Sequence, residues 1–401
     1  MKNSIRLLIV CPTLSDNGLA ASFRLIHLID YWLSQQVNVI VYVADDDISY
    51  LLKNHTNYKY LKIHVVRNNS QNNLFYKIKN RLFGIPDSLI FWANKVKKEI
   101  FQTYQSDSFD AVFISSPPHS LQVIGMQIAK YFNIVHFTDF RDDWMGSHRL
   151  KHIKLLHKYL TGKIEKEVLK NSALISHAIP FVAKEWKKTF KKYDYKIFPL
   201  SNGYPNYILH YVPNSNTIEY PKSTIVYFGG AYNNFVVEQF TKLRNELIES
   251  GLSERWMIVT GGPFEIPFAN DSVWIHYGNI PQDRVYDYIY NGTIHISLLP
   301  PGDLLPSRTI PLKLYTQLTT KGKCVFIGNK GATTELFKDV EGICFFDKDG
   351  WNNLIPWIKE NEKGLLSEKY VRKNIDKFNY LKISKELLHL MSMSLVQNRK
   401  K

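Results

Sequence analysis

Short, almost continuously apolar runs alternate with stretches of helical periodicity in the first half of the chain. The runs at 5–10, 37–43, 111–114 and 134–140 have the composition of strands that are buried on both faces of a sheet. Between them, apolar residues recur every three or four positions, as in 20–33. This alternation predicts βαβ units and a doubly wound parallel sheet.

The second half repeats the pattern, with apolar runs at 225–228, 256–259, 295–299 and 324–327. These runs lead into glycines or prolines, which end strands and, in the case of glycine, allow close approach of the backbone. The fold class that we expect is α/β, with two Rossmann-like, doubly wound domains facing a cleft. Ligands of such sheets bind beyond the carboxyl ends of the strands, so functional residues are expected in the loops that follow these runs.

The domain boundaries are predicted where helix signals are weak. Residues 1–205 are expected to form an N-terminal Rossmann-like domain, and residues 223–383 a second one. The segment 206–222 contains prolines and little helical pattern, which is typical of a linker. An apolar-striped helix with a basic end is predicted over 384–401.

Charge is the unusual part of the composition. The 401 residues include 51 lysines and arginines against 36 acids, a net charge of +15. This excess suits nucleic acid, a phosphate-bearing substrate or an acidic membrane face, although codon bias also enriches lysine. No apolar run approaches the ~18 residues that a membrane-spanning helix needs, and the apolar run near the start is too short for a secretory signal. The three cysteines form neither a disulfide framework nor a zinc pattern, so we expect a cytoplasmic protein.

Three loops in the first half hold candidate functional residues. Gly18 precedes the first predicted helix, where free backbone N–H groups suit an anion or where the glycine simply forms a tight turn. His119 follows two prolines at another helix start and is either functional or solvated. Asp139 and Arg141 end a strand, where a carboxylate can accept a hydroxyl proton and a guanidinium can hold a carboxylate or phosphate. The alternative for this pair is a structural ion pair that caps a helix.

The candidate residues of the second half suit a nucleotide. Gly229 and Gly230 end the first strand and allow close approach of a ligand. Arg308 and Lys313 place two cations before a helix, which is a plausible diphosphate clamp. Glu335 follows a later loop and is suited to binding ribose hydroxyls. Each residue alone also fits a turn, a surface charge or a helix N-terminal acid, but together they predict one phosphate-and-ribose pocket.

Two charged segments are less specific. Three consecutive aspartates at 45–47 imitate an Asp-x-Asp metal motif, although a solvated turn is the favoured interpretation and no metal site is predicted. Residues 149–170 combine lysines and arginines with apolar residues at helical spacing. Such a helix either lies on anionic lipid or packs with a solvated basic face.

Several ordered motifs resemble bacterial family 4 glycosyltransferases of the surface-polysaccharide type. SSPPHS at 115–120 and DFRDDW at 139–144 resemble that family's S-x-P-P-H-S and D-F-R-D-P-W segments, with an aspartate in place of the proline. SNGY at 201–204, GNIP at 278–281 and KLY at 313–315 resemble its linker entry, its "G-x-v-p" turn and the start of a later helix. The matches are spread over nearly the whole chain.

The resemblance implies a GT-B fold, in which the second domain mainly holds a nucleotide-sugar donor and the first an acceptor. It also implies no metal or other cofactor and usually a retaining outcome. Gly18 would belong to the donor-phosphate loop, and Lys313 and Arg308 would be the diphosphate cations. Glu335 would match the family's later glutamate, whereas Thr316 stands where an earlier glutamate is expected.

We therefore expect a glycosyltransferase that moves a sugar from a nucleotide-sugar donor to a glycan or lipid-linked acceptor, in the synthesis of a surface polysaccharide, lipopolysaccharide or capsule. Asp139, Arg141 and His119 would line the acceptor side, with Asp139 orienting or deprotonating the hydroxyl. An anionic membrane surface, at the inner face of the cell membrane, is the other expected partner.

Three alternatives remain open at this point. One is a nucleotide-sugar epimerase on the same fold, and another is a non-catalytic glycosyltransferase-like partner, which Thr316 makes credible. The third is a nucleic-acid-binding protein, suggested by the net charge. However, no recognised nucleic-acid module is present and the basic residues are not interleaved with aromatic ones, so no nucleic-acid partner is expected.

Overall fold

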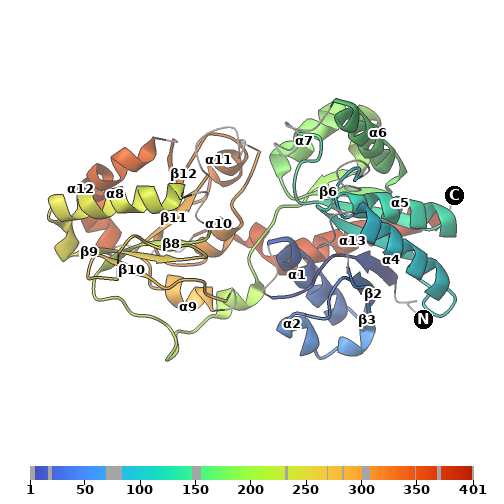
Figure 1. The fold of residues 1–401 in the computed structure, drawn as a ribbon, viewed down its shortest axis with the longest axis horizontal. Helices are drawn as coiled ribbons and strands as arrows, with labels where there is room; N and C mark the ends of the chain where they lie inside the picture. The colour runs from blue at the N-terminus through green and yellow to red at the C-terminus, as the bar shows by residue number, and fades with distance from the viewer. Residues whose placement is uncertain are drawn as a thin grey trace. The chain divides into compact units, whose positions relative to one another are not determined.

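The computed structural model divides into two compact units (Figure 1). Unit 1 comprises Met1–Asn202 and Tyr380–Lys401, and unit 2 comprises Gly203–Asn379. The structure describes residues 5–16, 20–68, 84–146, 155–230, 234–268, 270–281, 284–299, 308–347, 349–367 and 372–399.

Unit 1 is built on a seven-stranded sheet with the order β3-β2-β1-β4-β5-β6-β7, in which every pair is parallel. Its strands are β1 (Arg6–Val10), β2 (Asn38–Val43), β3 (Leu61–Val65), β4 (Ala111–Ser116), β5 (Val135–Phe140), β6 (Leu174–His177) and β7 (Ile197–Pro199). The four strands predicted from apolar runs are confirmed as β1, β2, β4 and β5. They lie in the middle of the sheet, where both faces are covered and a continuous apolar run is required.

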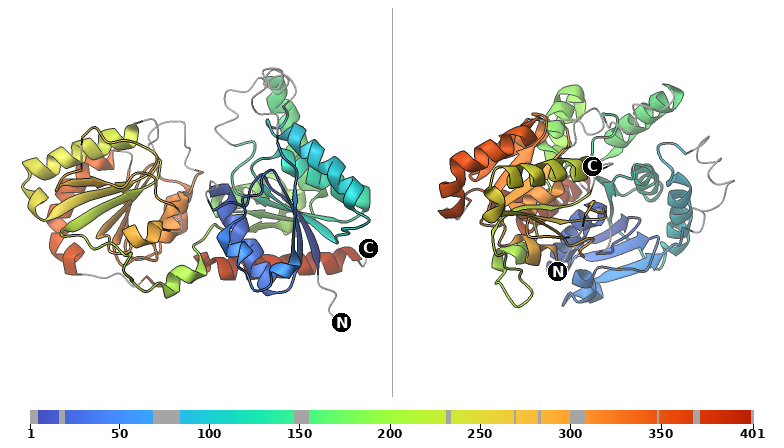
Figure 2. Two further views of the ribbon diagram at one scale, coloured as in Figure 1. Left: turned by 60° about the horizontal axis from the view of Figure 1, so that its bottom comes forward. Right: turned by 60° about the vertical axis from the view of Figure 1, so that its left-hand side comes forward.

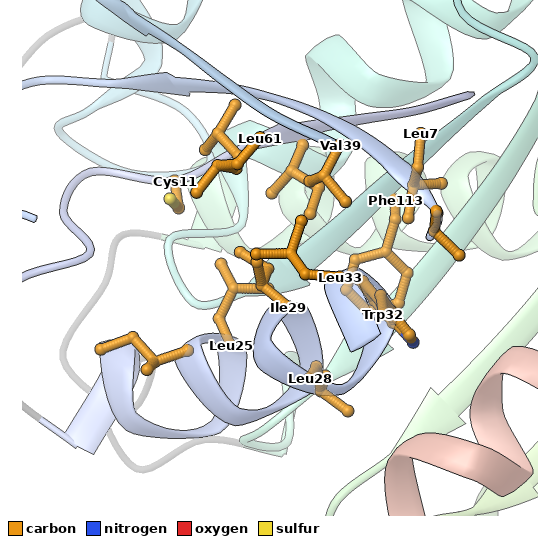
Figure 3. Close-up of a cluster of buried hydrophobic side chains, with 14 of the residues drawn as sticks. Leu7, Cys11, Leu25, Leu28, Ile29, Trp32, Leu33, Val39, Leu61 and Phe113 are labelled. Carbon is orange, nitrogen blue, oxygen red and sulfur yellow. The ribbon is translucent and has the colours of Figure 1, made fainter. Parts of the chain in front are cut away.

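Helices cover both faces of this sheet (Figure 2). They are α1 (Ala20–Ser34), α2 (Tyr50–Lys53), α4 (Ile90–Thr103), α5 (Ser120–Phe132), α6 (Leu155–Asn171), α7 (Pro180–Thr189) and α13 (Tyr380–Arg399), with short 3-10 turns η1 (Tyr58–Tyr60) and η3 (Lys191–Lys196). On one face α1 packs its apolar stripe against the strands, with Leu25, Ile29 and Trp32 pointing toward Val39 and Phe113 (Figure 3). A second core lies between the other face and helices α4 and α5.

The last helix of the chain belongs to unit 1. Helix α13 begins at Tyr380, and Leu387, Met391 and Leu395 share the core cluster of α1. The ring of His27 on α1 stacks on Tyr380 with ring centroids 5.1 Å apart. The C-terminal helix is thus an integral layer of unit 1. None of the described helices is long and apolar enough to cross a membrane.

Unit 2 contains a six-stranded parallel sheet with the order β10-β9-β8-β11-β12-β13. The strands are β8 (Ser223–Phe228), β9 (Trp256–Gly261), β10 (Trp274–His276), β11 (Ile294–Leu298), β12 (Lys323–Ile327) and β13 (Ile343–Phe346). The helices are α8 (Phe235–Glu249), α9 (Val285–Ile289), α10 (Leu312–Gln317), α11 (Ala332–Phe337) and α12 (Leu354–Ser367). The 3-10 turns are η4 (Asn206–His210), η5 (Leu252–Glu254), η6 (Gly350–Asn353) and η7 (Asp376–Phe378). The predicted strands are confirmed as β8, β9, β11 and β12. The short edge strands β10 and β13 were not predicted.

The segment between the two sheets packs on unit 2. Tyr211 donates a hydrogen bond from its hydroxyl to Asp287 on α9 at 2.7 Å, and its ring lies edge-on to Tyr286 with centroids 4.7 Å apart. The residues that the sequence analysis interpreted as a linker thus include a 3-10 turn, η4, and side chains bonded to α9.

Candidate functional site

Lys313 is the most unusual residue at the carboxyl edge of the unit 2 sheet. Its Nζ atom is buried and has no hydrogen-bond partner among the described residues. It lies 3.7 Å from the centroid of the Tyr227 ring at the end of β8. Burial lowers the pKa of Lys313 to about 7, because a charged ammonium loses its hydration there. The face of one aromatic ring only partly replaces that hydration, so the site favours an anion beside Nζ.

Helix α10, which carries Lys313, is fixed by polar contacts that the sequence analysis missed. Ser297 at the end of β11 donates a hydrogen bond to Gln317 Oε1 at 2.7 Å, and Gln317 Nε2 donates to Ile296 O at 3.2 Å. At the same, C-terminal end of the helix, Arg372 donates to Leu318 O at 2.9 Å. These buried bonds hold the helix on β11 and thereby set the position of the ammonium. A buried glutamine in an apolar helix was the available signal for this anchor.

Gly229 lies beside the Lys313 ammonium, and Gly230 follows it in the same turn. A Cβ atom built on Gly229 would lie 2.5 Å from Lys313 Nζ, and the Gly229 φ of +155° disfavours other residues. The Tyr227 hydroxyl donates a hydrogen bond to Gly230 O at 2.7 Å, which fixes the turn that follows β8. The predicted residues Gly229, Gly230 and Lys313 are thus brought together around Tyr227.

A neighbouring glycine, Gly262, supports this turn. Gly229 N–H donates to Gly261 O at 2.9 Å, and Gly262 N–H donates to Gly278 O at 2.7 Å, so three loops lie backbone to backbone. Gly262 has φ +153°, and a Cβ atom there would overlap the carbonyl oxygen of Gly229. Only glycine allows these backbones to approach so closely.

Replacing Gly262 with alanine is therefore expected to destabilise unit 2 and to displace the Gly229 turn. Positive φ and overpacking each cost about 1–3 kcal/mol, so the melting temperature should fall by several degrees. Differential scanning calorimetry measures the fall. Gly230→Ala is the matched control, because a Cβ atom on Gly230 meets no atom within 4 Å. Equal melting temperatures for the two variants would contradict the close approach.

Arg308 and Glu335 lie in the segment before α10 and on α11, respectively. Arg308 is partly buried in the segment that leads to α10, where the next carbonyl, Thr309 O, accepts a hydrogen bond from Thr333 Oγ1 at 2.9 Å. Glu335 is exposed on α11, and its carboxylate pairs with Lys338 Nζ at 3.1 Å. Gly18 lies outside the described residues. The expected roles of these three residues remain predictions.

In unit 1, Asp139 is the centre of a buried hydrogen-bond network at the carboxyl edge of the sheet. Its Oδ1 accepts hydrogen bonds from Arg24 Nη2 at 2.9 Å and Ser176 Oγ at 2.6 Å. Its Oδ2 accepts from Arg24 Nε at 3.0 Å and Ser115 Oγ at 2.7 Å. Burial alone would raise the pKa of Asp139, but the Arg24 guanidinium and the two serine hydroxyls outweigh it and hold the pKa below its usual value.

These contacts use all the acceptor positions of the Asp139 carboxylate. The side chain is fully buried and already bonded by four donors, so a substrate hydroxyl has no free oxygen to approach. Of the two roles expected for Asp139, orienting or deprotonating the acceptor hydroxyl, this bonding fits the orienting one better, and both remain predictions. The structural ion pair considered as the alternative exists, although its guanidinium comes from Arg24 on α1.

Arg24 was not identified from the sequence. Besides its two bonds to Asp139, it donates to Leu200 O at 3.0 Å and Ser201 O at 2.7 Å, at the end of unit 1. A signal was present, because Arg24 stands within the apolar stripe of α1, between Leu25 and the buried Ser22. A charged residue on the buried face of a helix requires a partner.

Arg141 and His119 lie at the same edge as Asp139. Arg141 Nη1 donates to Ser115 Oγ at 3.3 Å, so Ser115 joins the two predicted residues, and Arg141 Nη2 donates to Pro117 O. Burial lowers the pKa of Arg141. His119 precedes α5 and stacks on the Trp144 ring with centroids 4.4 Å apart and planes 7° apart. The structure therefore brings Asp139, Arg141 and His119 to one edge of the sheet.

Among the residues that the structure describes, no group of three His, Cys, Asp or Glu side chains could hold a metal ion. In the acidic run at 45–47, Asp45 accepts a hydrogen bond from Thr13 Oγ1 at 3.3 Å, and Asp47 accepts one from Ser15. Independence from metal remains a prediction.

Comparison with known proteins identifies the fold. No protein-family model and no curated protein matches this chain. Among solved structures, the glycosyltransferase from Rickettsia africae ESF-5 is 15% identical with a TM-score of 0.55, over 99% of this chain and 97% of that one. The Anabaena protein Alr3699/HepE in complex with UDP and the UDP-GlcNAc 2-epimerase from Methanocaldococcus jannaschii are each 11% identical with a TM-score of 0.59, over 97% of this chain and 100% of theirs.

These similarities cover both units and define the class of fold. The chain has a GT-B fold of two Rossmann-like domains, as the sequence motifs implied, and its structural neighbours include glycosyltransferases. The identities are too low to transfer an activity, so the assignment to family 4 remains a prediction.

Proposed function

We propose that this protein is a glycosyltransferase that uses a nucleotide-sugar donor. The observation that carries the proposal is the buried Lys313 ammonium, which has no hydrogen-bond partner among the described residues, at the carboxyl end of β8. A donor diphosphate beside Nζ would supply the missing acceptors and charge. The similar Anabaena structure holds UDP, which supports a uridine nucleotide as the first ligand to test.

The proposed chemistry divides between the two units. In unit 2, Lys313 would bind the diphosphate and neutralise the charge that develops on the departing nucleoside diphosphate, an interaction that strengthens in the transition state. Arg308 is the proposed second cation, and Glu335 the proposed ribose ligand. In unit 1, Arg141 and His119 would contact the acceptor, while Asp139 positions Ser115 and thereby Arg141.

The finer parts of the proposal come from the family resemblance. The acceptor would be a glycan or a lipid-linked sugar in the synthesis of a surface polysaccharide, lipopolysaccharide or capsule. Transfer would be metal-independent and retaining, in the cytoplasm or at the inner face of the membrane.

The first test is thermal stabilisation by UDP, GDP, CMP and ADP, with and without manganese. A nucleotide at 100 times its Kd should stabilise unit 2 by about 2.7 kcal/mol. Lys313→Gln should weaken that binding by about ten- to a hundredfold, because a charge-assisted hydrogen bond is lost. Lys359→Gln on α12, an exposed lysine of the same unit, is the control and should bind normally. Stabilisation that is unchanged in Lys313→Gln, or none with any nucleotide, would contradict the donor site.

An epimerase is the second candidate, because the solved UDP-GlcNAc 2-epimerase has the same fold as this chain. The two activities differ in their need for an acceptor. Incubation with a panel of UDP-sugars should release UDP only when an acceptor glycan or glycolipid is added. Formation of an epimeric UDP-sugar without any acceptor would favour the epimerase instead.

A further inference from the structure

The outer face of helix α6 exposes large apolar side chains. Leu155 is 86% exposed, Leu156 65% and Tyr159 60%. A solvated helix face normally carries polar residues, and three exposed apolar residues within two turns are an unfavourable arrangement in water. The exposed apolar side chains therefore indicate that this face binds a partner.

Lysines surround these apolar residues on the same side of the helix. At about 100° per residue, Lys163, Lys166 and Lys170 fall on the exposed side with the two leucines and the tyrosine. Lys163 Nζ lies 4.5 Å from the centroid of the Tyr159 ring. Among the described residues of α6 this side has one exposed acid, Glu167, because Glu165 is buried. The face is therefore both apolar and strongly basic.

Helix α6 is packed on its other side from Thr161 onward, where its buried residues lie. Val168 and Leu169 are fully buried. Glu165 accepts a hydrogen bond from Met145 N–H at 3.2 Å, and burial raises the pKa of Glu165 to about 8, so this carboxyl is protonated near neutral pH. Lys196 donates to Lys170 O at 3.0 Å, which binds η3 to the end of α6.

Further exposed lysines lie on the elements that follow α6. The lysines of α7 and η3 that are exposed are Lys184, Lys188, Lys191 and Lys192. Because Lys196 ends η3 and bonds to the last turn of α6, these lysines lie on elements next to that end of the helix.

We propose that the exposed face of α6 is a docking surface for an anionic lipid bilayer. Leu155, Leu156 and Tyr159 would enter the boundary between headgroups and acyl chains, and the flanking lysines would contact phosphate groups. Nucleic acid fits this face less well, since it offers phosphates to the lysines but no apolar phase to the two leucines. The role of the surface, delivery of the enzyme to a lipid-linked acceptor, rests on the proposed function, whereas the binding itself does not.

The test is co-sedimentation of the full chain with vesicles of phosphatidylglycerol and phosphatidylcholine, compared with pure phosphatidylcholine. The expected result is binding to the anionic vesicles that weakens as salt increases. Lys163→Gln and Lys166→Gln should each weaken it about fivefold. Leu155→Ser and Leu156→Ser should each weaken it about tenfold, at unchanged melting temperature. Val212→Ser, which changes a 74% exposed apolar residue of unit 2, is the matched control and should bind as the wild type does.

Three outcomes would overturn the proposal: equal binding to neutral vesicles, unchanged binding by the α6 variants, or preference for duplex nucleic acid over vesicles. Thermal stabilisation by UDP is measured on the same variants. If the donor proposal alone fails, UDP has no effect while the vesicles still bind. If the docking surface alone fails, the α6 variants and the wild type respond equally to UDP and equally to vesicles.

Discussion

Replacing Arg24 with alanine is expected to unfold most of unit 1 under mild conditions. The change leaves the Asp139 carboxylate buried with only the hydroxyls of Ser115 and Ser176 as donors. Removing one partner of a buried ion pair typically costs about 3–5 kcal/mol, a large part of the ~5–15 kcal/mol by which domains are stable. It also frees Leu200 O and Ser201 O, which Arg24 binds. Thermal unfolding followed by calorimetry measures the loss.

Two controls separate this effect from a general loss of charge. Arg6→Ala removes a partly exposed guanidinium that pairs with Asp110 at 3.1 Å, and should cost less than about 1 kcal/mol. The double variant Arg24→Leu with Asp139→Leu should be more stable than the sum of the single changes predicts, because no charge is left unpaired. Stabilisation of unit 2 by a nucleotide should persist in all of them. An Arg24→Ala protein as stable as Arg6→Ala would show that the ion pair contributes little.

The stability that the Arg24–Asp139 pair contributes to unit 1 should fall at low pH. Because the folded-state pKa of Asp139 lies below its unfolded value, the pair adds stability above the unfolded pKa. That contribution is lost as the pH falls through the folded-state pKa. Asp139→Asn should therefore show a smaller loss of stability on acidification than the wild type.

The apolar pattern of the sequence predicted most of the strands that lie inside the sheets, but it missed β6. Strands β1, β4 and β8 are covered on both faces, and each contains a continuous apolar run, whereas β11 includes His295 and Ser297. The edge strand β10 has only three residues, one of them His276, and gives no such signal. Pattern-based prediction therefore succeeded where an apolar run marks burial on both faces. It failed at the edge strands and at β6, which contains the polar residues Ser176 and His177.

The candidate site was only partly predictable. Asp139, Arg141 and His119 were found because they follow strands, and parallel sheets bring the ends of adjacent strands together. Their contacts were not predictable, because the partner of Asp139 is 115 positions away in the chain, on α1. Local sequence specifies which residues reach the edge of the sheet, whereas long-range packing decides whether a carboxylate is free to react or is already bonded.

Lys313 illustrates the same limit in unit 2. Its position before a helix predicted a cation for a diphosphate, which any exposed lysine could satisfy. The tertiary structure adds that Nζ is buried against Tyr227 and beside Gly229. Burial in that environment lowers the pKa of Lys313, an effect that an exposed lysine would not show.

The binding of UDP is expected to take up a proton at pH 8. In the free protein burial lowers the pKa of Lys313 to about 7, so at pH 8 about nine in ten side chains are neutral. A diphosphate beside Nζ favours the charged form and raises this pKa, so binding must draw close to one proton from solution. The phosphates of UDP are already ionised at pH 8, since a terminal phosphate has its second pKa near about 6. The affinity should therefore fall by up to tenfold per pH unit above pH 7.

Isothermal titration calorimetry in buffers of different ionisation enthalpy counts this proton directly. The apparent binding enthalpy of the wild type should change with the buffer at pH 8 and much less at pH 6, where Lys313 is already charged. Lys313→Arg is the decisive control, because a guanidinium stays protonated at both values and should bind UDP without taking up a proton. A wild type without buffer dependence, or an arginine variant with the same dependence, would mean that Lys313 does not face the diphosphate. Uptake of a proton by the wild type alone would place the charge of the donor at this ammonium and would make donor affinity in the cell sensitive to pH above neutrality.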